Sequence, residues 1–161
     1  MSADTNMIRI LAVDDHPMFR EALAALLGSQ PDMKVVAEAA SGREAIQQFR
    51  THQPDVTLMD LQMPGMNGLD AMAAIRNEFP DARIIILTTY ENDVEDAMNG
   101  GARAYLVKTY WDKELFGTIR AVHGGKQDCP RRVAKLRIRG RRVRCWSRSQ
   151  HDLFENRKPP Q

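Results

Sequence analysis

Short apolar runs alternate with segments of helical period along residues 8–124 of this 161-residue chain. Five runs of four to six residues predict β-strands, at positions 8–13, 33–37, 56–59, 84–87 and 104–107. Between the runs, apolar residues recur every three or four positions, which is the spacing of one helix face. Because strand and helix alternate five times, the pattern predicts an α/β fold in which helices connect the strands of a parallel sheet.

Residues with strong positional preferences mark where several helices begin and end. Pro17 suits the first turn of the first helix and Gly28 suits its end. Ser41, with Glu44 three positions later, predicts a capping box for the second helix. Asp112 is expected to cap the fifth helix. The third, fourth and fifth helices take their apolar faces from Leu69, Met72 and Ile75; Val94, Ala97 and Met98; and Leu115, Ile119 and Val122.

Polar residues that can carry chemistry follow four of the five apolar runs. In an open parallel sheet, the functional site forms outside the carboxyl ends of the strands. Asp14 and Asp15 follow the first run, Asp60 the third, Thr88 the fourth and Lys108 the fifth. The second run is followed by nothing comparably reactive. We therefore expect these side chains to share one rim of the sheet.

Three carboxylates at one rim would repel one another and raise each other's pKa unless a cation neutralised them. The oxygen ligands of Asp14, Asp15 and Asp60 favour a hard ion, and a site open to water suits Mg²⁺. Asp60, beside Mg²⁺ and opposite Lys108, is placed to act as a nucleophile that forms an acyl phosphate. The metal and the ammonium would then stabilise the phosphoryl oxygens, and Thr88 would donate a hydrogen bond to the product.

Four separate strings resemble the receiver domain of bacterial two-component response regulators, and two of them look most like the NarL/FixJ class. They are VDDHPMFREAL at 13–23, LMDLQMPGMNGLD at 58–70, ILTTY at 86–90 and GARAYLVK at 101–108. The resemblance covers nearly all of residues 8–124. It implies a flavodoxin-like (βα)5 doubly wound parallel sheet with strand order 2-1-3-4-5.

The resemblance also implies a role for each candidate residue. Asp60 would be the phosphoacceptor, and Asp14 and Asp15 the acidic pair that serves Mg²⁺ together with Asp60 and the backbone carbonyl of Gln62. A sensor histidine kinase would supply the phosphoryl group, and the chain would catalyse only its own phosphorylation and dephosphorylation. The resemblance leaves open whether two chains form a homodimer. The phosphate partner, the switch hydroxyl and the switch aromatic would be Lys108, Thr88 and Tyr105.

Simpler interpretations stand beside several of these roles. Thr89 competes with Thr88 as the switch, although neighbouring residues of a strand point to opposite faces. Tyr105 on an apolar strand also suits the core, and His16, just before a proline, suits the beginning of the first helix. The segment from Thr88 to Lys108 looks about two residues shorter than the family pattern, and the loss falls in the fourth helix. Signal output is therefore expected to differ while the phosphate chemistry survives.

Charge divides the chain at residue 125. Residues 1–125 carry 11 Lys and Arg against 18 Asp and Glu, a net charge of −7, whereas residues 126–161 carry 12 against 3, a net charge of +9. We expect a receiver domain over 1–125 and an Arg-rich, disordered or irregular tail over 126–161, which does not resemble the family's helix-turn-helix output module. Such a tail would bind DNA at most weakly and without sequence preference. His123, Cys129, Cys145 and His151 can be drawn as a zinc site, but their spacing matches no common finger.

The composition excludes several other classes of protein. With 43% hydrophobic and 27% charged residues the chain reads as globular, and no run approaches the roughly 18 apolar residues of a spanning helix. The start of the chain lacks a secretory signal, so a cytoplasmic protein is expected. The leading hypothesis is a receiver from a truncated or degraded transcriptional regulator. The alternatives are an intact DNA-binding regulator that uses the basic tail, and a Mg²⁺-dependent phosphatase with an aspartate nucleophile.

Overall fold

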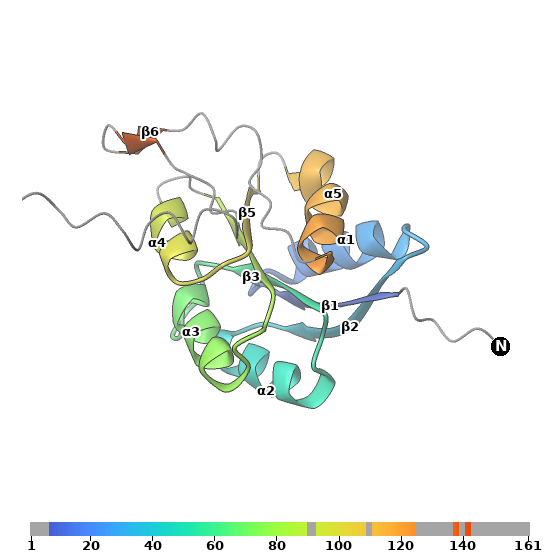
Figure 1. The fold of residues 1–161 in the computed structure, drawn as a ribbon. Coiled ribbons are helices and arrows are strands. Elements are labelled where there is room, and N and C mark those ends of the chain that lie inside the picture. Colours follow the sequence, from blue (N-terminus) through green and yellow to red (C-terminus); the bar gives the residue numbers. More distant parts are fainter. Residues whose placement is uncertain (1–6, 90–92, 109–110, 125–136, 139–140, 143–161) are drawn as a thin grey trace, which may run out of the picture.

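The computed structural model describes residues 7–89, 93–108, 111–124, 137–138 and 141–142. Its centre is a sheet of five parallel strands in the order β2-β1-β3-β4-β5 (Figure 1). This order confirms the flavodoxin-like, doubly wound fold predicted from the sequence. The strands are β1 Ile8–Val13, β2 Met33–Ala39, β3 Val56–Asp60, β4 Ile84–Thr88 and β5 Ala104–Val107.

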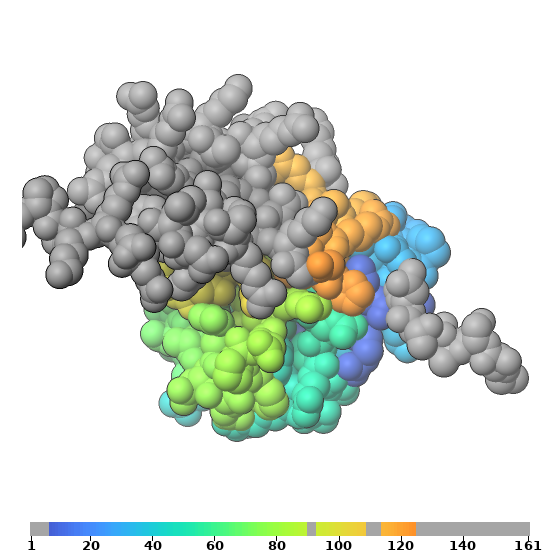
Figure 2. All heavy atoms as spheres, viewed as in Figure 1, coloured from blue at the N-terminus to red at the C-terminus, as the bar shows by residue number. Residues whose placement is uncertain are grey.

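Helices cover both faces of the sheet (Figure 1). α1 and α5 pack on one face, while α2, α3 and α4 pack on the other. Figure 2 shows α2 and α3 side by side. Arg50 of α2 forms an exposed ion pair with Glu78 of α3, and beneath it the ring centres of Phe49 and Phe79 lie 5.0 Å apart. The helices are α1 Pro17–Gly28, α2 Gly42–His52, α3 Gly68–Glu78, α4 Val94–Asn99 and α5 Trp111–His123.

Strand alternation divides the core into two layers. In β1, Ile10 and Ala12 pack in the layer with α1 and α5, whereas Leu11 and Val13 pack in the layer with α2 and α3. β3 and β4 are buried at every position, which is typical of parallel strands covered on both faces. The sheet is therefore covered on both faces, and polar residues follow the ends of its strands.

The ends of α1 and α2 follow the local signals of the sequence. α1 begins at Pro17 and ends at Gly28. The Ser41 hydroxyl accepts a hydrogen bond of 3.2 Å from the Glu44 N–H at the start of α2. The Glu44 carboxylate accepts a bond in return from the N–H of Ala40, one residue before the usual partner in a capping box.

Four boundaries differ from the sequence prediction. β3 and β4 each end one residue later than the apolar run that predicted them. β2 continues to Ala39, two residues past the apolar run, because Ala12 and Val13 of β1 still pair with Glu38 and Ala39. The prediction that Asp112 caps α5 is wrong, because the helix already begins one residue earlier. A capping residue precedes the first helical residue, so a helix that starts one position early leaves Asp112 inside it.

Four residues of the basic segment belong to the described structure. Arg137–Ile138 (β6) pairs antiparallel with Arg141–Arg142 (β7). The expectation that 126–161 is irregular stays a prediction, since most of that segment lies outside the described residues. Three residues of the possible zinc site, Cys129, Cys145 and His151, also lie outside them. Among the described helices, none is long and apolar enough to cross a membrane.

Candidate functional site

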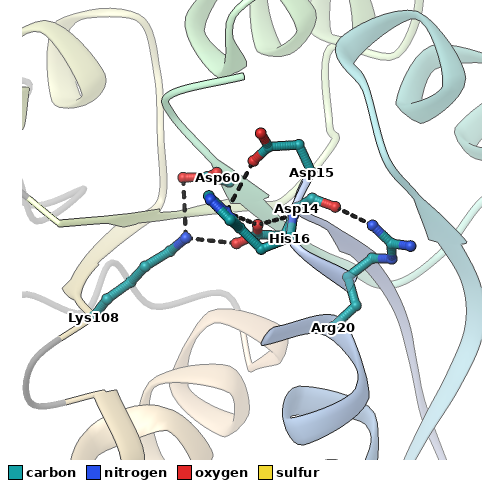
Figure 3. A network of polar contacts seen from close by, with 6 residues as sticks. All are labelled: Asp14, Asp15, His16, Arg20, Asp60 and Lys108. Atoms are coloured by element: carbon teal, nitrogen blue, oxygen red, sulfur yellow. Dashed lines mark hydrogen bonds and ion pairs between the residues drawn. The ribbon is translucent and has the colours of Figure 1, made fainter. Parts of the chain in front are cut away.

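The carboxyl ends of four strands bring predicted polar residues to one rim of the sheet, and Figure 3 shows the charged ones among them. Asp14 follows β1, Asp60 ends β3, Thr88 ends β4, and Lys108 follows β5. Asp14 and Asp60 are both buried, with 0% and 3% of their surface exposed. Two carboxylates this deep in the protein require partners, because burial strongly disfavours an isolated charge.

Lys108 supplies the positive charge that contacts both buried carboxylates. Its Nζ lies 2.5 Å from Asp14 Oδ2 and 3.3 Å from Asp60 Oδ1, so the ammonium bridges two strands (Figure 3). The Nζ also lies 4.4 Å from the centre of the Phe19 ring of α1. The sequence places Lys108 opposite Asp60, and the structure adds that Asp14 is the nearer partner.

Further hydrogen bonds hold Asp14 in place. Its Oδ1 accepts a bond of 2.8 Å from the His16 N–H, and its backbone carbonyl accepts one of 2.5 Å from the Arg20 guanidinium. The Asp14 N–H donates to the carbonyl of Ala39 on β2. Both carboxylate oxygens of Asp14 are therefore engaged before any ligand arrives, one by Lys108 and one by the backbone.

His16 belongs to the same cluster, which the sequence analysis missed. Its Nδ1 lies 2.9 Å from Asp14 Oδ1 and 3.1 Å from Asp15 Oδ1. The residue does precede α1, as predicted, but its ring turns back over the acidic pair (Figure 3). The adjacency of His16 to Asp14 and Asp15 in the chain was the available signal.

The pKa of Asp60 is raised from 3.8 to about 6. Burial is the main cause, because it disfavours the charged carboxylate, and the negative charge of Asp14 adds to it. Lys108 and a hydrogen bond from the Gln62 backbone act in the opposite direction. Repulsion and desolvation thus outweigh the ammonium, which agrees with the expectation that the carboxylates of this rim need another cation.

The residues at the rim fit a hard divalent cation. One oxygen or nitrogen atom from each of Asp14, Asp15, His16 and Asp60 can be chosen so that all lie within 4.8 Å of one another. Asp15 Oδ1 is buried, accepts no hydrogen bond from any described residue and lies 3.1 Å from His16 Nδ1, so a cation at this point would satisfy it. Carboxylate oxygens are the ligands that Mg²⁺ prefers.

The loop between β3 and α3 packs closely against the end of β3. A Cβ atom on Gly68 would lie 2.2 Å from the Asp60 carbonyl oxygen, so only glycine permits this approach. Gly65 has φ +77°, a left-handed conformation that glycine adopts readily. The Asn67 side chain caps α3 by accepting from the Asp70 N–H at 2.9 Å. This loop carries Gln62 along the cleft beside Asp15.

The two predicted switch residues are both buried. Thr88 is fully buried whereas Thr89 is exposed, as strand alternation requires, and this favours Thr88 over its neighbour. Tyr105 is 1% exposed and packs in the core layer that contains Val94 and Ala97 of α4. Their roles as switch hydroxyl and switch aromatic stay predictions.

Comparison with known proteins agrees with the fold and shows the family. Residues 10–120 match the response regulator receiver domain family. The transcriptional regulatory protein LiaR of Bacillus subtilis is 42% identical over 130 residues, which cover 80% of this chain and 62% of LiaR. The oxygen regulatory protein NreC of Staphylococcus carnosus is 40% identical over 121 residues, which cover 73% of this chain and 56% of NreC. The chain thus spans about three fifths of the length of these curated relatives.

Solved structures show the same likeness. A LuxR-family response regulator from Aurantimonas sp. is 37% identical and superposes with a TM-score of 0.72, over 75% of this chain and 88% of that one. The response regulator domain of Thermotoga maritima CheB is 33% identical, with a TM-score of 0.69 over 73% of this chain and 97% of that one.

Proposed function

The chain belongs to the response regulator receiver family, and from that premise we propose that it accepts a phosphoryl group on Asp60. The observation that supports this role is the position of Asp60, buried at the end of β3 with the Lys108 ammonium 3.3 Å away and the acidic pair beside it. A pKa of about 6 leaves most Asp60 carboxyls ionised at neutral pH and able to attack phosphorus.

The chemistry is a transfer from a phosphohistidine of a sensor histidine kinase. An oxygen of the Asp60 carboxylate forms a bond to phosphorus, and the bond between phosphorus and the donor nitrogen breaks, with its electron pair staying on the imidazole. Asp14, Asp15, Asp60 and the Gln62 carbonyl would hold Mg²⁺. When bound, Mg²⁺ neutralises the carboxylates and draws negative charge from the phosphoryl oxygens.

Two residues of the chain act on the product. Lys108 can leave the unmodified Asp60 and pair with a phosphoryl oxygen, since it is already tethered to Asp14 at 2.5 Å. Thr88, buried at the end of the neighbouring strand, would donate a hydrogen bond to another phosphoryl oxygen. Movement of Thr88 toward the phosphate would then be coupled to Tyr105 and α4.

The receiver would act in the cytoplasm as part of a transcriptional regulator. Residues 1–125 form the phosphoacceptor domain in this proposal, and 126–161 are an irregular basic segment. Its net charge of +9 would give weak, salt-sensitive and non-specific contact with DNA. Pairing of two receivers into a homodimer would be the further step toward output.

Phosphorylation of the full chain with Mg²⁺ and a small acyl phosphate tests the assignment. Intact mass spectrometry should show one added phosphoryl group that hydroxylamine removes. The Asp60→Asn variant should show none, whereas Asp81→Asn, which changes an exposed aspartate before β4, should match the unmodified sequence. Labelling of the Asp60 variant at the full level would contradict the assignment.

A further inference from the structure

His16 adds a nitrogen atom to a cluster whose other ligands are carboxylate oxygens. One ligand atom from His16 lies within 4.8 Å of one from each of Asp14, Asp15 and Asp60. The Lys108 ammonium in the same network has no lone pair with which to bind a metal. The imidazole is therefore the feature of this rim that an oxygen-seeking ion would not use.

The contacts of the imidazole leave one oxygen unsatisfied. Nδ1 lies 2.9 Å from Asp14 Oδ1 and 3.1 Å from Asp15 Oδ1, but a single Nδ1 hydrogen can point at one of them. Asp14 Oδ1 already accepts a hydrogen bond from the His16 backbone. Asp15 Oδ1 is buried and accepts no hydrogen bond from the described residues. A cation beside Nδ1 would satisfy the unpaired oxygen of Asp15.

The spacing of these atoms suits a transition metal. Bonds of about 2.1 Å to nitrogen and oxygen place neighbouring ligand atoms of an octahedral site about 3 Å apart. The ring already lies at such separations from both carboxylates through its hydrogen bond and ion pair, so Nδ1 could exchange its shared proton for a metal ion with little movement. Imidazole is a good ligand for Zn²⁺, Co²⁺ and Ni²⁺, whereas Mg²⁺ binds oxygen.

We propose that His16 is the residue that sets the metal specificity of this site, by adding Nδ1 as a ligand for Zn²⁺ and Co²⁺ but not for Mg²⁺. The inference rests on the proposed function, because the same carboxylates hold the ion in both cases. For Mg²⁺ the ring stays outside the ligand set. For Zn²⁺ or Co²⁺ the neutral ring binds through Nδ1 and keeps its proton on Nε2.

His16 can be replaced without disturbing the fold. Its side chain is 67% exposed, and it makes no capping hydrogen bond to the described backbone of α1. Asparagine is a favoured residue at such a helix start and offers a hard amide oxygen in place of the nitrogen. His16→Asn therefore replaces a possible nitrogen ligand with an oxygen ligand. The matched control is His52→Asn, at the far end of α2.

The experiment measures metal affinity and the visible spectrum of bound Co²⁺, without phosphorylation. The full chain carries Cys129→Ser and Cys145→Ser, so that thiolates do not compete for the metal. Mg²⁺, Zn²⁺ and Co²⁺ are titrated calorimetrically into this protein, into the same protein with His16→Asn, and into the same protein with His52→Asn. We expect His16→Asn to lower the affinity for Zn²⁺ and for Co²⁺ at least tenfold and to shift the absorption band of bound Co²⁺. The affinity for Mg²⁺ should change less than threefold.

Each other outcome would overturn the inference. If His16→Asn lowered the affinity for all three metals equally, His16 would only position the carboxylates. An unchanged Co²⁺ spectrum, or the same loss in the His52 control, would mean that Nδ1 is not a ligand. Absence of Mg²⁺ binding to the unsubstituted site would instead count against the metal site of the proposed function, so the two failures are distinguishable.

Discussion

Charged side chains are placed differently at the two ends of the sheet. At the amino ends of the strands, the Arg9 guanidinium donates to the carbonyls of His52 and Gln53 at 2.8 and 3.0 Å, and its backbone N–H donates to Asp55. Arg83 likewise donates to the carbonyl of His123. These charges lie at partly open positions, and the guanidinium groups satisfy carbonyls at the ends of α2 and α5.

At the carboxyl ends, charge is buried and in excess. Asp14 and Asp60 share the single ammonium of Lys108, and Asp60 keeps a raised pKa in spite of it. The comparison teaches that the amino ends stabilise the fold, whereas the carboxyl ends hold buried charges that oppose folding and that a cation would stabilise. Three substitutions test this division.

Lys108→Met should have the largest effect. The substitution leaves Asp14 and Asp60 buried without their ammonium, and breaking a buried ion pair on one side costs roughly 3–5 kcal/mol. We expect that loss of unfolding free energy in urea at pH 8, and a further rise in the pKa of Asp60, measured by carbon NMR of its carboxyl. The exposed Lys34→Met on β2 is the control, and an equal loss there would break the comparison.

Asp60→Asn should stabilise the protein, and the gain should depend on pH. The folded state holds the proton of Asp60 up to about pH 6 and the unfolded state only to about 3.8, so the stability of the unsubstituted chain falls between these values as pH rises. A shift of about two pKa units corresponds to roughly 3 kcal/mol. The variant should thus gain roughly 2–3 kcal/mol at pH 8 and almost nothing below pH 4, measured by urea unfolding. A gain that is equal at both pH values would contradict burial of the charge as its cause.

Arg9→Gln should have the smallest effect and the opposite sign. The substitution shortens the side chain that reaches the carbonyls of His52 and Gln53. Because each such hydrogen bond contributes about 1 kcal/mol net, we expect a loss of roughly 1–2 kcal/mol in unfolding free energy. The loss should be the same at pH 5 and pH 8 and should leave metal binding unchanged. A pH-dependent loss would show that the two ends of the sheet are coupled.

The sequence predicted the arrangement of the site better than its energetics. Asp60, Thr88 and Lys108 were assigned to the strand ends because alternation and apolar runs are local properties of the chain. The end of β2 was missed because pairing of Glu38 and Ala39 with β1, rather than their side chains, decides where that strand stops. His16 was assigned to the start of α1, and nothing in its helical context shows that the ring folds back.

The sequence by itself determined the order of the elements and which polar residues follow the strands. Both depend on patterns among residues within about ten positions of one another. Only the tertiary structure decided that Lys108 lies nearer to Asp14, 94 positions away, than to Asp60. It also decided how deeply Asp60 is buried, and hence its pKa. The physical reason is that these quantities depend on distances between strands and on excluded water, and both arise only when the sheet and its helices close around the site.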